Sequence, residues 1–327
     1  MNKKEQMSYI GSIQQLAYIR QVRLEDGRAD GMRMVILENG RLHLEIMADK
    51  CLDIASLRIN GENRSFLAKN GLQGLSCYDA DGPEAQRSIM GGLFFTCGPD
   101  NVGPPQQEGG REKPMHGRFR VTPAEHLCCN AFWRSDEYTL QVSGEMRVAE
   151  LFGENIVLRR TIETKLNSPN IRIHDEIINE GFSDVPLMIL YHVNVGFPLL
   201  REGAEVIIPS QQVVARDAEA QRGLNQWNTM PRPTSNAPEQ VFYHEGLPER
   251  VRIGVRNPAG QALWIEYERD ALPVLTQWKS SAAGDYVVGL EPGNCHVEGV
   301  ISEREKGTLM MLEPYACKTV DLTITAE

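Results

Sequence analysis

Apolar and polar residues alternate with a period of two along much of the chain. In residues 42–47 the apolar Leu42, Leu44 and Ile46 alternate with other residues, and residues 320–325 repeat the pattern. Such alternation is typical of strands that bury one face and expose the other. Further runs of the same kind occur at residues 32–37, 54–59, 138–148, 156–166, 171–178, 251–256 and 263–267.

Turn signals separate these runs, for example Asn60-Gly61 and the Asn-Pro-Ala-Gly segment 257–260. Only residues 211–222 have a helical pattern, with Ser210 as the expected N-cap and Gly223 as the expected stop. Many strands with short turns and few helices predict an all-β fold of antiparallel sheets packed as a sandwich. Without a repeat or a low-complexity linker, we expect residues 1–327 to form one domain.

Two stretches have neither period, residues 73–114 and 222–248, and both are rich in Gly, Pro, Asn and Asp. Irregular segments of this length in a compact domain are usually functional or mobile. The first stretch contains Arg87 and the segment Gly91-Gly92, and it leads into His116.

The chain has 327 residues and a formal net charge of −10, and no basic stripe is visible. Nucleic acid and anionic membranes are therefore not expected as partners, since such binding needs clustered cations. The longest apolar segment, residues 185–200, is interrupted by His192 and Asn194 and is too short to span a bilayer. Seven cysteines without metal-ligand spacing are read as reduced thiols, which favours a cytoplasmic protein.

The sequence lacks the common nucleotide-binding, zinc-protease and serine-hydrolase motifs. Three polar residues in unusual surroundings remain as candidates for chemistry: His116, His192 and Glu291. Each also has a purely structural explanation. His116 before Gly117 fits a turn, His192 fits a buried and hydrogen-bonded histidine, and Glu291 fits an exposed strand end.

Taken together and in this order, the segments around these residues resemble the aldose 1-epimerase (galactose mutarotase) family. Arg87 with the following Gly-Gly segment resembles the family's sugar-binding arginine and glycine-rich strand. Met115-His116-Gly117-Arg118 resembles the first histidine motif, and Tyr191-His192-Val193-Asn194 resembles the second. Gly289-Leu290-Glu291-Pro292 resembles the strand with the general base, and residues 272–278 resemble the Pro-x-Leu-x-x-Trp segment that ends at Trp278.

The resemblance implies a β-supersandwich and a metal-independent isomerase that interconverts the anomers of an aldose. Glu291 would take the proton of the anomeric hydroxyl, His192 would protonate the ring oxygen, and His116 would hydrogen-bond the sugar. Substrate contacts would come from Arg87, Asn101, Arg118, Asn194 and Trp278. No cofactor is implied, and the expected ligand is a small sugar, with a homodimer left open.

This chain departs from the family where the family has an aspartate between the second histidine and the base. In that window it offers residues 226–228 and 241–245 instead. The segment 96–103 also differs from common galactose enzymes, which suggests another substrate. A binding or sensing protein that does not catalyse is the main alternative. A metal-dependent isomerase or lyase that uses His116, His192, His244 and His296 is a third hypothesis.

Overall fold

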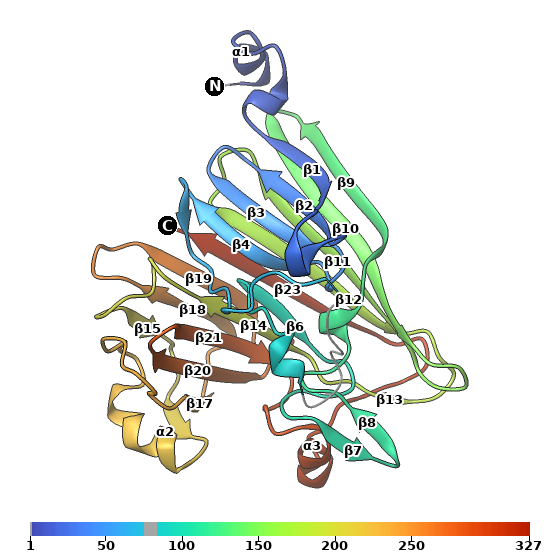
Figure 1. Cartoon of the computed structure of the whole chain (residues 1–327). Helices are drawn as coiled ribbons and strands as arrows, with labels where there is room; N and C mark the ends of the chain where they lie inside the picture. The colour runs from blue at the N-terminus through green and yellow to red at the C-terminus, as the bar shows by residue number, and fades with distance from the viewer. Residues whose placement is uncertain (1, 75–83) are drawn as a thin grey trace.

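Two large antiparallel sheets form the body of the protein (Figure 1). A computed structural model describes residues 2–74 and 84–327, so Cys77 and part of the predicted loop 73–114 lie outside the described residues. In this part of the chain the larger sheet has eleven strands. Ten follow one another in the order β1 (Tyr18–Arg23), β2 (Arg33–Glu38), β3 (Leu42–Met47), β4 (Asp53–Ile59), β6 (Phe94–Cys97), β14 (Leu190–Val195), β21 (Asp285–Gly293), β20 (Val274–Ala282), β17 (Gln240–Glu245) and β16 (Gln212–Ala215), and β5 (Glu62–Asn63) pairs with β4.

The second sheet has eight strands among the described residues. Their order is β15 (Glu205–Ile207), β18 (Arg250–Arg256), β19 (Ala262–Glu268), β23 (Cys317–Ala326), β12 (Asn170–Asn179), β11 (Asn155–Lys165), β10 (Glu137–Ala149) and β9 (Glu125–Arg134). Two short pairs complete the strands, β7 (Gln106–Glu108) with β8 (Arg111–Lys113) and β13 (Val185–Pro186) with β22 (Met311–Leu312). The predicted all-β sandwich of antiparallel sheets is confirmed.

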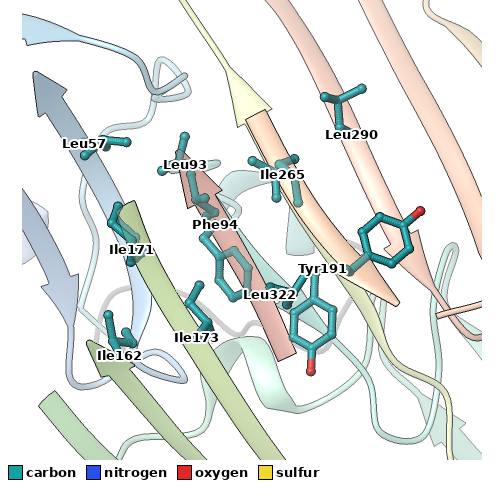
Figure 2. Packing of buried hydrophobic residues seen from close by; sticks show 14 of the residues in the cluster. Leu57, Leu93, Phe94, Ile162, Ile171, Ile173, Tyr191, Ile265, Leu290 and Leu322 are labelled. Atoms are coloured by element: carbon teal, nitrogen blue, oxygen red, sulfur yellow. The ribbon is translucent and has the colours of Figure 1, made fainter. Parts of the chain in front are cut away.

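The hydrophobic core lies between the two sheets, as Figure 2 shows. Leu57 and Phe94 come from the larger sheet, and Ile162, Ile171 and Leu322 come from the smaller one; all five are at most 2% exposed. The alternation in the sequence produces this arrangement because successive side chains of a strand point to opposite faces. Truncation of one such side chain to alanine typically costs about 2–5 kcal/mol of stability.

Helices are few and short. The α-helices are α1 (Lys3–Met7), α2 (Ala218–Gly223) and α3 (Val300–Lys306), and the 3₁₀ turns are η1 (Ile13–Gln15), η2 (Gly27–Ala29), η3 (Ala85–Arg87), η4 (Phe119–Val121) and η5 (Leu224–Gln226). In the residues that the structure describes, no helix has the length and apolar character needed to cross a bilayer.

The helix predicted at residues 211–222 is wrong in its first half. Gln212–Ala215 is strand β16, which pairs with β17, and the helix begins only at Ala218. Its N-cap is Asp217, which accepts from the backbone N–H groups of Glu219 and Ala220, and not Ser210. The β-branched Val213 and Val214 favour a strand here once a neighbouring strand is available to pair with them.

A buried ionic network joins the two sheets behind β6 and β14. Arg160 on β11 donates to Asp53 on β4 at 2.9 Å and to both oxygens of Asp175 on β12 at 2.9 and 2.6 Å. Thr96 donates to Asp53 through its hydroxyl (2.6 Å) and its backbone N–H (2.9 Å), and Tyr191 donates to Asp175 (2.9 Å). Burial raises the pKa of Asp53 to about 6, although Arg160 opposes the shift.

Candidate active site

The register of five neighbouring strands places one residue from each strand in a row on one face of the larger sheet. Tyr243 pairs with Thr276, and Thr276 pairs with Glu291. The β14 to β21 register sets His192 beside Glu291, and His192 pairs with Phe95. We call Tyr243, Thr276, Glu291, His192 and Phe95 the transverse row. Because side chains alternate along strands, the row faces away from the core that Phe94, Tyr191 and Leu290 help to build (Figure 2).

His192 and Glu291 are in direct contact at the centre of the transverse row. His192 Nε2 lies 3.0 Å from Glu291 Oε1, and the two side chains are 12% and 2% exposed. The contact is close enough for an ion pair, but its angles are not those of a hydrogen bond, and Oε1 has no hydrogen-bond partner among the described residues. An imidazole and a carboxylate, the two usual side chains of acid–base catalysis, therefore lie side by side.

Gly289 provides the room for this contact. A Cβ atom at Gly289 would lie 2.7 Å from Glu291 Oε1 and 2.7 Å from His192 Cε1, closer than real Cβ atoms come to other atoms. The position lies next to Glu291 on the same face of β21 because the two residues are separated by two along the strand. With any larger residue at position 289, the carboxylate, the imidazole or both would have to move from their present positions.

His116 reaches the same face from a loop instead of from a strand. Its backbone has φ of 58°, in the left-handed region, and Gly117 follows with φ of 73°. A Cβ at Gly117 would lie 2.4 Å from the carbonyl oxygen of Gly98, so the loop before β7 packs directly on this turn. The ring centroids of His116 and His192 are 6.3 Å apart, and Phe95 contacts both rings edge-on at 5.9 and 6.1 Å.

The environment of His116 keeps its imidazole neutral. Burial, together with the nearby His192 and Arg120, lowers its pKa to about 3. At neutral pH the ring therefore has a single N–H and one free lone pair. It can donate a hydrogen bond to a ligand, but it cannot supply a proton as an imidazolium would.

Trp278 and Asn194 lie two residues along their strands from Thr276 and His192, so they are on the same face as the transverse row. Both pair with Gly289, from β20 and β14 respectively. The Trp278 ring lies 5.5 Å from the His192 ring, edge to face, and its Nε1 donates to Glu239 at 2.9 Å. Asn194 donates to the carbonyl oxygens of Gly92 and His192. These two residues extend the site along the strand direction.

Unsatisfied polar atoms concentrate at this site. Ten buried side-chain atoms of the described residues have no hydrogen-bond partner, and four of them lie here: His192 Nδ1, Glu291 Oε1, Thr276 Oγ1 and Asn194 Oδ1. Buried polar groups are nearly always hydrogen-bonded in native proteins, so each exception needs an explanation. The transverse row and Asn194 therefore hold several buried polar atoms whose hydrogen-bonding capacity is unused in this structure.

The other expected binding residues have partners elsewhere in the protein. Asn101 is fully buried, and its amide contacts the carbonyl oxygens of Pro104 and Pro114 and the backbone N–H of Val300. Arg118 pairs with Asp100 and also donates to the carbonyl oxygen of Glu112. Both side chains therefore form their contacts with residues around the His116 loop, and not with His192 or Glu291.

Arg87 is also engaged away from the two histidines. It lies on η3, is 66% exposed and pairs with Glu84 at 3.2 Å. No contact joins it to His116, His192 or Glu291 in the described part of the chain.

Sequence reasoning missed three members of the site, Tyr243, Thr276 and Phe95, together with Gly289. Tyr243 lies in the window where the family's aspartate was sought, and its hydroxyl donates to Glu298 at 3.2 Å. Burial raises its pKa above the ordinary value, so the hydroxyl stays protonated. Alternation within each strand could have placed these residues on one face, but not beside one another.

A cavity of about 440 Å³ lies apart from the transverse row, lined by residues that include Arg58, Asn63 and Phe66. Neither histidine nor Glu291 lines it. We place the site at the row in spite of this cavity, because the row has the acid–base pair and the unsatisfied atoms. Within the described residues, no three His, Cys, Asp or Glu side chains are grouped as metal ligands would be.

Comparison with known proteins extends these findings. A protein from Klebsiella pneumoniae described as a candidate aldose 1-epimerase superposes with a TM-score of 0.89 at 22% identity, over 100% of this chain and 86% of the other. A galactose mutarotase-like protein from Clostridium acetobutylicum has a TM-score of 0.64 at 12% identity, over 96% and 99%. The galactose 1-epimerase of Lactobacillus acidophilus has a TM-score of 0.58 at 12% identity, over 95% and 99%.

Identities this low show a shared fold, and the expected likeness to aldose 1-epimerases and galactose mutarotases is confirmed at that level. A comparison with curated proteins finds no match. The model of one family matches residues 29–326, nearly the whole length. The chain therefore belongs to the DUF4432 family, a domain of unknown function with the galactose mutarotase-like fold.

Proposed function

We propose that the transverse row binds an aldose and interconverts its anomers by opening and closing the sugar ring. The observation that carries the proposal is the 3.0 Å contact between His192 Nε2 and Glu291 Oε1, next to unsatisfied polar atoms of both residues. The anomeric hydroxyl and the ring oxygen of an aldose are bonded to the same carbon atom. An acid and a base that act on these two oxygens must therefore lie close together, as His192 and Glu291 do.

In this scheme Glu291 accepts the proton of the anomeric hydroxyl while His192 donates a proton to the ring oxygen. The bond between C1 and the ring oxygen breaks, and the open-chain aldehyde forms. After rotation about C1–C2, the freed hydroxyl attacks the other face of the carbonyl. His192 takes back the proton of that hydroxyl, Glu291 returns its proton to the carbonyl oxygen, and both residues regain their starting states.

His116 has a separate role from His192. Because its imidazole is neutral at physiological pH, it donates one hydrogen bond to the sugar and helps to polarise the ring oxygen. Trp278 offers an aromatic surface beside His192, and Asn194 offers an unsatisfied amide oxygen to a hydroxyl. None of these steps is assigned to a metal or an organic cofactor.

The test is Glu291→Gln, which keeps the shape of the side chain but removes the base. Anomer exchange is followed by NMR for a panel of neutral and anionic aldoses, with and without protein. The wild type should accelerate exchange of at least one sugar, and Glu291→Gln should lose about 10²–10⁴-fold of that acceleration while it still binds the sugar. Glu245→Gln, an exposed glutamate on β17 of the same sheet, is the matched control and should remain active.

Two outcomes contradict the proposal. If Glu291→Gln exchanges anomers as fast as the wild type, the assigned base is wrong. If a sugar binds at the row but no sugar of the panel exchanges faster, the protein is a carbohydrate-binding module without this activity.

A further inference from the structure

The thiol of Cys97 contacts the imidazole ring of His116. Its Sγ is 3.4 Å from His116 Nδ1, within hydrogen-bonding distance for sulfur. Cys97 is completely buried and follows Phe95 by two residues on β6, so both side chains face the histidines. Only one of the two atoms can donate the hydrogen in this contact, and the direction decides what His116 can offer a ligand.

The direction follows from the protonation states of the two groups. Burial raises the pKa of the Cys97 thiol well above its ordinary value, and the charge of Glu291 adds to the shift, so the group remains S–H. The imidazole of His116 is neutral, and an unprotonated ring nitrogen accepts a hydrogen bond better than a thiol sulfur does. The S–H group therefore donates to Nδ1.

The direction of this hydrogen bond decides which ring nitrogen of His116 holds the proton. With Nδ1 as the acceptor, the single ring proton must be on Nε2. Nε2 has no hydrogen-bond partner within the described residues, so its N–H is available to a ligand.

We propose that Cys97 is a positioning residue that orients His116 and holds it as the Nε2–H tautomer, so that the histidine presents a donor to an oxygen of the substrate. The kinetic consequence rests on the proposed epimerase activity, but the state of the imidazole does not. The atom that meets His116 would be an oxygen with a free lone pair, such as the ring oxygen of a pyranose.

The chain offers a matched set of variants. Cys97→Ala removes the donor, and Cys97→Ser keeps a donor of similar size. Cys295→Ala is the control because Cys295 is also buried and belongs to the same small apolar cluster as Cys97, while its thiol forms no hydrogen bond with a histidine ring among the described residues. Any effect of losing a buried thiol as such should appear in Cys295→Ala as well.

The experiment is ¹⁵N NMR of the histidine rings in the full-length protein, without sugar. In the wild type, His116 Nε2 should give the signal of a protonated nitrogen, and Nδ1 that of an unprotonated nitrogen shifted by an accepted hydrogen bond. In Cys97→Ala the Nδ1 signal should move toward that of an unbonded nitrogen, and Cys97→Ser should restore it. A proton on Nδ1 in the wild type, or an Nδ1 signal unchanged in Cys97→Ala, would overturn the proposal.

Kinetics give a second readout. Cys97→Ala should reduce kcat/KM about 2- to 10-fold, as expected for one lost hydrogen bond, and Cys97→Ser should recover most of the loss. An unchanged kcat/KM in an active Cys97→Ala protein would contradict the positioning role. If the wild type exchanges no anomers, the epimerase proposal fails by itself, while the ring spectra still decide the state of His116.

Discussion

Tyr191 Oη donates a 2.9 Å hydrogen bond to Asp175 Oδ2, and this bond ties the strand that holds His192 to the opposite sheet. Tyr191 and His192 are adjacent on β14 and face opposite sides of it. Through Asp175 the tyrosine joins Arg160, and through Arg160 it joins Asp53 on β4 and Thr96 on β6, the strand next to β14. On the core side, the network therefore fixes β6 and β14, the two strands that hold Phe95 and His192 of the transverse row.

We predict that Tyr191→Phe destabilises the protein by about 1–3 kcal/mol, because the buried Asp175 loses a donor. Urea unfolding measures the loss. Tyr267→Phe is the control, since the buried hydroxyl of Tyr267 has no hydrogen-bond partner among the described residues. Removal of that hydroxyl should be neutral or stabilising. Equal losses for the two variants would show that the network adds nothing to stability.

Gly289→Ala should abolish anomer exchange and leave the fold intact. The added methyl group would meet Glu291 Oε1 and His192 Cε1 at 2.7 Å, so the acid or the base must leave its present position. We expect a loss of at least about 100-fold in kcat/KM, comparable to the loss of one acid–base group. Circular dichroism checks the fold, and Gly11→Ala, with only one atom at 3.9 Å from the added carbon, is the control. An active Gly289→Ala enzyme would contradict the assigned geometry.

Trp278→Leu should weaken sugar binding about 2- to 10-fold, the range expected for loss of one aromatic contact. The matched control is Trp264→Leu, because Trp264 belongs to β19 of the other sheet. Titration followed by NMR or calorimetry gives the affinity of each variant. The prediction is wrong if both variants bind the sugar as the wild type does.

His244 should make stability depend on pH. Burial lowers the pKa of His244 to about 4, against 6.5 for an unburied histidine. Above pH 6.5 the group is neutral in both the folded and the unfolded state. Between pH 6.5 and 4 the unfolded chain binds a proton that the folded protein does not, so stability falls as the pH falls.

The variant His244→Gln isolates this contribution. The free energy of unfolding of the wild type minus that of the variant should be largest above pH 6.5 and should shrink toward pH 4. Urea unfolding at a series of pH values measures the difference. A difference that is constant over this range would show that His244 is not kept neutral by the fold.

The sequence alone could predict many of the strands and, within those strands, which side chains share a face. Alternation identified β3, β10 to β12 and β23, because each buries one side and the period of two is strong. It could not predict which strands pair or in what register, because that depends on contacts between residues far apart in the chain. The neighbours of His192 in the transverse row, Glu291 and Phe95, are each about 100 residues away from it.

Two other features of the structure could not be predicted from the sequence because they depend on tertiary partners. Arg160 is a charged residue in a strand, a pattern that normally indicates a solvent-facing position, yet it is 1% exposed and paired with two aspartates. The strand at Gln212–Ala215 has the pattern of a helix because it is short and continues into α2. In both cases tertiary partners outweighed the local preference of the sequence.

The transverse row distributes the residues of the candidate site over several strands of one sheet. Its five side chains come from five different strands, and of these β20 and β21, which hold Thr276 and Glu291, follow each other in the chain and share a hairpin turn. At a strand separation of about 4.8 Å, Tyr243 lies two strands and about 10 Å from Glu291 along the row. A substitution at Tyr243 can therefore alter which sugar is accepted without moving His192 or Glu291, whereas Phe95 contacts the His192 ring directly. Change at the Tyr243 end would let relatives with this fold diverge in substrate while they keep one chemistry.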